Sequence, residues 1–141
     1  MAELISVYPI FLIVMTVIAV VVFISLFFVD AGYGMFKTKK WGASIPNRLG
    51  WVLMESPVFI LMIVLFALSD RTSNIACLAM LIIFELHYFQ RSFIFPMLIR
   101  GKSSMPLSII TMGVVFNLLN ALMQGGWLFY VSPLERYTVD W

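Results

Sequence analysis

The chain has 141 residues, of which 62% are hydrophobic and only 11% are charged. Soluble domains contain about 45–50% apolar and about 25% charged residues, so the composition excludes an ordinary soluble domain and a disordered chain. One cysteine and one histidine are too few for a disulfide framework or a Cys/His metal cluster. A net charge of +2 without a long basic run excludes a nucleic-acid-binding surface. The sequence therefore predicts a small polytopic membrane protein, or a part of one.

Four apolar stretches are each long enough to cross a bilayer as a helix, which takes roughly 20 residues. They cover residues 5–29, 49–68, 75–99 and 105–131. The first stretch has neither the basic start nor the small-residue cleavage site of a signal peptide, so we expect it to be retained. The predicted fold is all-α and integral to a membrane, with four transmembrane helices in a single transmembrane domain over residues 1–141.

The basic residues of the short loops predict how these helices are oriented. Six of them lie in the two loops that join the first span to the second and the third to the fourth, while the loop at residues 69–74 has one arginine. Because positively charged loops stay in the cytoplasm, we expect the N-terminus to be lumenal or periplasmic, in an endoplasmic-reticulum or bacterial inner membrane. The six residues are Lys37, Lys39, Lys40, Arg48, Arg100 and Lys102.

Ionisable residues inside two spans need an explanation, because a charge at mid-bilayer costs about 2.5–3.5 kcal/mol on insertion scales. Glu55 lies in the second span, where it is either an interfacial carboxylate, half of a structural ion pair, or part of a site. In the third span, one arc of the helix collects Glu85, His87, Tyr88, Arg91 and Ser92. These side chains either satisfy one another, for example Arg91 with Glu55 or Glu85, or bind a polar ligand in an apolar cavity.

The fourth span carries three amides at helical spacing: Asn117, Asn120 and Gln124. We expect them to make hydrogen bonds between helices rather than to touch a ligand. Neither a nucleophile triad nor a phosphate-binding glycine loop can be assembled from the sequence.

Several motifs together resemble the steroid 5α-reductase family. A Trp-x-x-x-Glu-x-Pro string at residues 51–57 and a His-Tyr-Phe-x-Arg string at residues 87–91 occur in that family's order and spacing. The turn at residues 32–34, the segment at residues 98–106 and the stretch at residues 120–125 also look like that family. The resemblance extends from about residue 31 to the end of the chain.

Members of that family are seven-helix membrane enzymes that reduce the carbon–carbon double bond of an enone with NADPH. The resemblance implies that this chain matches their first four helices, and that a carboxy-terminal half supplies much of the NADPH site. It implies a 3-oxo-5α-steroid 4-dehydrogenase, which acts on the C4–C5 double bond of 3-oxo-Δ4 steroids. Two alternatives stay open: a reductase of another lipid enone or enoyl substrate, and a non-catalytic four-helix scaffold subunit.

The resemblance also implies roles for individual residues. Glu55 and Tyr88 match two members of the family's Gln-Glu-Tyr set, which binds the substrate carbonyl, and Met54 stands where the family usually has Gln. A hydrogen donor aimed at that carbonyl stabilises the negative charge that develops there as hydride attacks the β-carbon. Tyr88 has a phenolic hydrogen, and we expect Glu55, desolvated in a bilayer cavity, to keep a proton and donate it as well.

The remaining candidates would surround the substrate and the cofactor. Trp51 and Phe116 are expected to be flat apolar walls for a sterol-like ring system. Arg100 and Lys102, at the predicted cytoplasmic mouth, suit contacts with phosphate. The alternative is ordinary loop charge, which explains Lys102 equally well. The residues expected on the NADPH side are Tyr33, Arg91, Arg100, Lys102 and Asn120.

Overall fold

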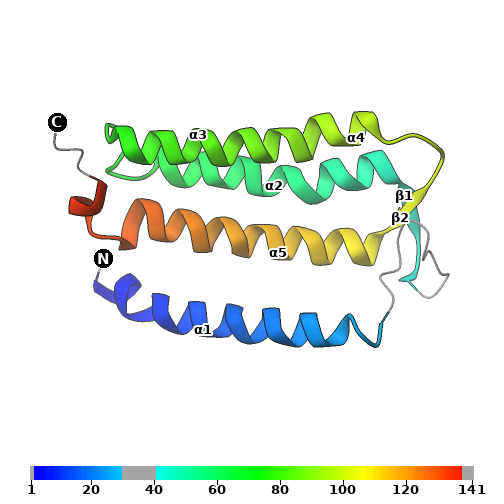
Figure 1. Cartoon of the computed structure of the whole chain (residues 1–141), viewed down its shortest axis with the longest axis horizontal. Coiled ribbons are helices and arrows are strands. Elements are labelled where there is room, and N and C mark those ends of the chain that lie inside the picture. The colour runs from blue at the N-terminus through cyan, green and yellow to red at the C-terminus, as the bar shows by residue number, and fades with distance from the viewer. Residues whose placement is uncertain (1, 30–40, 138–141) are drawn as a thin grey trace.

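Four long helical rods lie side by side in the computed structural model, which describes residues 2–29 and 41–137 (Figure 1). Each rod is long and apolar enough to cross a membrane, so the prediction of a helical membrane fold with four transmembrane helices is confirmed. The rods are α1 (Ala2–Ser25), α2 (Asn47–Ala67), α3 (Ile75–Phe89) continued by η3 (Gln90–Ile94) and α4 (Phe95–Leu98), and α5 (Leu107–Gly126) continued by η4 (Trp127–Val131) and followed by the short η5 (Leu134–Tyr137).

The first helix is shorter than its apolar run. α1 ends at Ser25, whereas the hydrophobic sequence continues to Val29. The Ser25 hydroxyl donates to the Val21 carbonyl at 2.7 Å, and the amides of Phe27 and Phe28 bond to carbonyls only three residues back, those of Ile24 and Ser25. The chain therefore tightens into a turn that hydropathy does not reveal.

The rod of the third span changes to π-helical winding at η3, directly before a proline. Pro96 has no N–H for the helical bond to Ser92, and its ring would clash with that carbonyl. The Phe95 N–H bonds instead to the Gln90 carbonyl, five residues back. α5 ends in the same way at η4, again just before a proline. A π-turn holds one more residue than an α-turn, so it changes the face on which the following side chains lie.

Two three-residue strands join the beginnings of α2 and α5. β1 (Ser44–Pro46) pairs antiparallel with β2 (Ser104–Pro106), with Ile45 opposite Met105. Each strand ends in a proline directly before a helix, where the missing N–H is harmless. This short ladder is an addition to the all-α fold, and it sets α2 and α5 side by side and pointing the same way (Figure 1).

Glycines let α2 and α5 approach closely. At Gly113 an added Cβ would overlap the Met54 side chain, and at Gly125 it would come within 2.8 Å of Leu65 Cδ1. Small residues at such contacts allow helix backbones to pack tightly where lipid offers no hydrophobic driving force. α3 completes the core from the other side, with its Leu81 and Cys77 buried against residues of α2 and η4.

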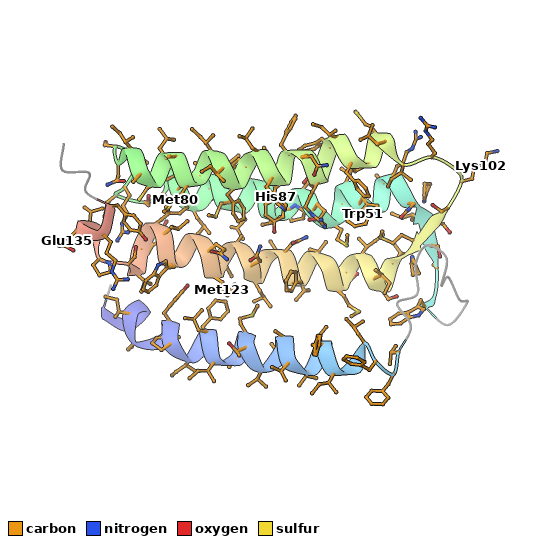
Figure 2. All side chains as sticks on the ribbon, viewed as in Figure 1. Trp51, Met80, His87, Lys102, Met123 and Glu135 are labelled. Atoms are coloured by element: carbon orange, nitrogen blue, oxygen red, sulfur yellow. The ribbon has the colours of Figure 1, made fainter. Side chains whose placement is uncertain are left out.

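α1 lies beside α5 at the edge of the bundle (Figure 1). Only 6% of the residues in its most apolar stretch are buried. The Tyr8 hydroxyl donates to the Met123 carbonyl at 2.5 Å, and its ring stacks on Trp127 with centroids 5.8 Å apart. Figure 2 shows Met123 on the side of α5 that faces α1. α1 is therefore anchored to α5 and η4 near its own N-terminal end.

Arg71 ties the loop between α2 and α3 to the end of η4. Its guanidinium donates to the Leu128 carbonyl at 2.7 Å, to Ser132 Oγ at 2.8 Å and to the Ser132 carbonyl at 2.6 Å. The last carbonyls of a helix have no helical donor, so a cation there both completes hydrogen bonds and faces the negative end of the helix dipole.

Replacing Arg71 by alanine is expected to lower the free energy of unfolding by about 1–3 kcal/mol, because it removes the guanidinium that donates to the Leu128 and Ser132 carbonyls. The measurement is unfolding of the chain by SDS in mixed micelles. Arg71→Lys keeps the charge but not the planar fork, so its loss should be intermediate. Thr72→Ala, at an exposed neighbour, is the control. An equal loss in the control would contradict the assignment.

Candidate functional site

Glu55 lies buried in α2, next to Pro57, with only 3% of its surface exposed. Its Oε1 accepts a hydrogen bond from Nη2 of Arg91, which belongs to η3, at 2.5 Å. A carboxylate buried in a membrane-spanning bundle is stable only with such a partner. The two residues therefore form an ion pair that ties α2 to the third rod.

Asn117 of α5 engages the other oxygen of the same carboxylate. Its Nδ2 donates to the Met54 carbonyl at 2.8 Å and lies 3.3 Å from Glu55 Oε2. Both carboxylate oxygens thus accept hydrogen bonds, as an ionised group does. These contacts differ from the expectation that Glu55 keeps a proton and donates it, because a guanidinium and an amide, both donors, already face it.

Tyr88 is buried between α3 and α5, one turn before Arg91. Asn120 Nδ2 donates to the Tyr88 hydroxyl at 2.8 Å. The Tyr88 ring packs on Phe84 and meets the edge of the His87 ring, with centroids 4.6 Å and 5.1 Å away. Since the hydroxyl oxygen accepts from the amide, its own hydrogen is left to point at another acceptor.

The residues just described form a central cluster, and Trp51 extends it toward the β1–β2 end. The members of the central cluster are Glu55, Tyr88, Arg91, Asn117 and Asn120. The Arg91 guanidinium carbon lies 5.4 Å from the centre of the Trp51 ring, and the Phe95 ring meets Trp51 edge-on at 4.9 Å. Met54 lies instead in the contact between α2 and α5, against Gly113. Figure 2 shows Trp51 among the helices, whereas Lys102 is at the end of the bundle.

The predicted polar arc of the third span is narrower in the structure. Tyr88 and Ser92 are buried, but His87, at the edge of the arc, is exposed. Glu85 lies partly buried on the other edge, and both its carboxyl oxygens are covered without a hydrogen-bond partner among the described residues. The π-turn of η3 redirects the side chains that follow it, so an arc drawn at 100° per residue cannot hold over its whole length.

The amides of α5 behave largely as expected. Asn117 and Asn120 make hydrogen bonds to α2 and α3, which confirms the predicted interhelical role for these two. Gln124 is exposed. The sequence did not indicate that Asn117 would contact Glu55. The spacing of three residues between Asn117 and Asn120, which places both amides on one helix face, is the signal that pointed to a shared polar contact.

Three other predicted site residues lie away from the central cluster. The Phe116 side chain is 58% exposed on α5. Arg100 and Lys102 are exposed in the segment between α4 and β2. Tyr33 lies outside the described residues.

A groove of about 520 Å³ lies beside the β1–β2 ladder. The Arg48 guanidinium forms one rim and donates to the Ile99 carbonyl at 2.7 and 3.1 Å. Lys102 and three serines also line the groove. Cations and hydroxyl donors of this kind suit an anionic group.

Comparison with known proteins identifies relatives of one kind, although no protein-family model matches the chain. The steroid 5-alpha-reductase DET2 of Gossypium hirsutum is 32% identical over 135 residues, which are 92% of this chain and 52% of that protein. The 3-oxo-5-alpha-steroid 4-dehydrogenase 1 of Mus musculus is 31% identical over 126 residues, which are 88% of this chain and 48% of the relative. The 3-oxo-5-alpha-steroid 4-dehydrogenase 2 of Sus scrofa is 33% identical over 121 residues, covering 82% of this chain and 47% of the relative.

The resemblance inferred from the motifs is therefore confirmed: the chain is homologous to the steroid 5α-reductase family. It spans about half the length of the curated relatives it matches, as an amino-terminal half would.

A double-mutant cycle tests the pair of Glu55 and Arg91. Arg91→Met and Glu55→Gln should each lower the free energy of unfolding in mixed micelles by at least about 1 kcal/mol, because each removes one side of an ion pair whose carboxylate is buried. The double variant should be less destabilised than the sum of the two. We use the lower end of the usual range because the Arg91 side chain is 39% exposed. Additive losses would show that the pair does not interact.

Proposed function

We propose that this chain is the amino-terminal, substrate-binding part of a membrane oxidoreductase that reduces the C4–C5 double bond of 3-oxo-Δ4 steroids. The names of the relatives support the steroid substrate and the reaction. The observation that carries the proposal is the Tyr88 hydroxyl, buried between membrane-type helices, which accepts from Asn120 and so has its own hydrogen available. The relatives' names also favour a steroid over another lipid enone.

The proposed chemistry requires a hydrogen donor at the steroid carbonyl. As hydride adds to the β-carbon at C5, the double-bond electrons shift and negative charge develops on the C3 oxygen. Tyr88 would donate its phenolic hydrogen to that oxygen, which stabilises the transition state more than the ground state. Asn120 would position the phenol and strengthen it as a donor, because hydrogen bonds in a chain polarise one another.

Glu55 takes a supporting part in this proposal. Its carboxylate would hold the Arg91 guanidinium in place against the Trp51 ring. The Glu55–Arg91 pair is nearly neutral and held in a fixed position, and its Arg91 lies one turn after Tyr88. Trp51, Met54 and Phe116 stay proposed substrate contacts, and Phe116 could serve only from the outer side of α5, where it is exposed.

NADPH is the proposed reductant, and when bound it supplies the hydride. Arg100 and Lys102 fit its phosphates in charge and exposure, and the groove beside them holds further donors on Arg48 and the serines. Arg91 and Asn120 are already engaged with Glu55 and Tyr88, so on the NADPH side they would act through those residues. We further propose that a carboxy-terminal half completes this site and the seven-helix bundle.

In the full-length protein, Tyr88→Phe is expected to lower the turnover of a 3-oxo-Δ4 steroid at least about tenfold, the order expected for the loss of one oxyanion donor. The measurement is NADPH oxidation together with detection of the 5α-reduced product. Tyr130→Phe is a matched control, since its hydroxyl is bonded to the Leu65 carbonyl, away from the site. Unchanged turnover in Tyr88→Phe would contradict the proposal and favour a scaffold role for the cluster.

The proposed orientation places the β1–β2 end in the cytoplasm and the opposite end in the lumen or periplasm. Cys77 is fully buried, so the native thiol adds little background to labelling with a membrane-impermeant maleimide. Intact cells expose the outer face of the membrane to the reagent, and inverted vesicles expose the cytoplasmic face. Lys102→Cys should be labelled in inverted vesicles only. Glu135→Cys, at the other end of the bundle in Figure 2, should be labelled from the outside only. The reverse pattern would overturn the orientation.

A further inference from the structure

Asn117 is a buried side chain of α5 that makes hydrogen bonds to both Met54 and Glu55, with 5% of its surface exposed. The assignment of its nitrogen follows from chemistry. The Met54 carbonyl can only accept a hydrogen bond, so the atom 2.8 Å from it must be the amide nitrogen. The same nitrogen therefore presents an N–H to Glu55 Oε2.

The contact of Asn117 with Oε2 restricts the rotation of the Glu55 carboxylate, which the ion pair alone does not fix. A carboxylate held only through one oxygen can still rotate about the bond that carries it. The Asn117 amide at Oε2 and the Arg91 guanidinium at Oε1 hold both ends of the group, so together they define its plane. The direction in which Arg91 lies over Trp51 then follows from the position of α5.

The same face of α5 also positions Tyr88. Gly113, Asn117 and Asn120 follow one another at spacings of four and three residues, which places them on one side of the helix. Gly113 accommodates the Met54 side chain, Asn117 bonds to Glu55, and Asn120 bonds to Tyr88. One helix face thus holds both of the residues that resemble the family's carbonyl-binding set.

We propose that Asn117 is a positioning residue for Glu55, and that it supplies from α5 the amide that Met54 does not supply from α2. The resemblance implies that Met54 stands where the family usually has Gln. Its side chain lies against Gly113, one turn before Asn117 on α5, and its backbone carbonyl accepts from Asn117. This inference rests on the proposed function for its link to turnover, but not for the contact itself.

The test is a rescue experiment in the full-length protein, with NADPH and a 3-oxo-Δ4 steroid. Asn117→Leu should lower kcat at least about tenfold while KM changes less than about threefold, because the carboxylate plane is lost and the apolar walls remain. Adding Met54→Gln to Asn117→Leu should recover at least about threefold in kcat, since a Gln at position 54 has nearly the length of Met and returns an amide to the same contact.

Matched variants separate the amide from packing. Met54→Leu in the Asn117→Leu background returns no amide, so kcat should stay low. Thr111→Val, an exposed position on α5 whose hydroxyl bonds within its own helix, should change kcat less than about twofold. Equal recovery by Gln and Leu at position 54 would overturn the proposed exchange of amides. If Asn117→Leu does not fold, Asn117→Ser takes its place, because its shorter hydroxyl falls short of Oε2.

A spectroscopic arm tests the contact without any activity. In the purified chain in lipid vesicles, the infrared carboxylate band that disappears in Glu55→Gln belongs to Glu55. Asn117→Leu should shift that band, whereas Thr111→Val should not. An unshifted band would overturn the role of Asn117 whatever the kinetics show. A shifted band in a protein that reduces no steroid would retain Asn117 as the partner of Glu55 and reject the proposed reaction.

Discussion

A carboxylate inside a membrane bundle must have partners, and the partners of Glu55 organise this structure. Arg91 comes from the third rod and Asn117 comes from α5, so one carboxylate of α2 connects three of the four helices. The close approach of α2 and α5 at Gly113 is what brings the amide within reach. The ion pair and the close helix approach therefore act on the same carboxylate: loss of Arg91 would remove its charged partner, and loss of the close approach would remove its amide donor.

Two neighbouring hydrogen-bonding groups have opposite characters in this arrangement. Glu55 receives donors on both oxygens and is chemically satisfied, whereas the Tyr88 oxygen receives a donor and its hydrogen is still available. A group whose acceptors are all occupied, such as Glu55, orients its neighbours. A group with a free hydrogen, such as Tyr88, can donate it to a ligand. The structure thus separates two roles that the residue types alone do not distinguish, and it supports the phenol as the group that would meet a carbonyl oxygen.

Hydropathy located all four membrane helices, and the residues of interest were visible because Glu55, Tyr88 and Arg91 interrupt apolar runs. The sequence offered Glu55 and Glu85 as alternative partners of Arg91, and the structure shows the pair with Glu55. The contact of Asn117 with Glu55 was not predicted, because the two residues lie 62 positions apart on different helices. The π-turn at η3 escaped prediction because a proline-induced change of winding leaves hydropathy unchanged. The β1–β2 ladder escaped it because strands of three residues carry too little periodic signal. The sequence thus indicated the candidate side chains and the possible pairs of Arg91, whereas the choice between those pairs and the partners of the amides required the structure.

The β1–β2 ladder has a consequence for depth. Pro46 and Pro106 end the two paired strands, so α2 and α5 both begin directly at this ladder. At about 1.5 Å per residue, Glu55 lies about 14 Å and Asn117 about 17 Å further along their helices. Half of a hydrocarbon core about 30 Å thick is about 15 Å. If the ladder marks one surface of the membrane, Glu55 and Asn117 lie near the midplane. A molecule that reaches the neighbouring Tyr88 then has to enter the depth of the hydrocarbon core.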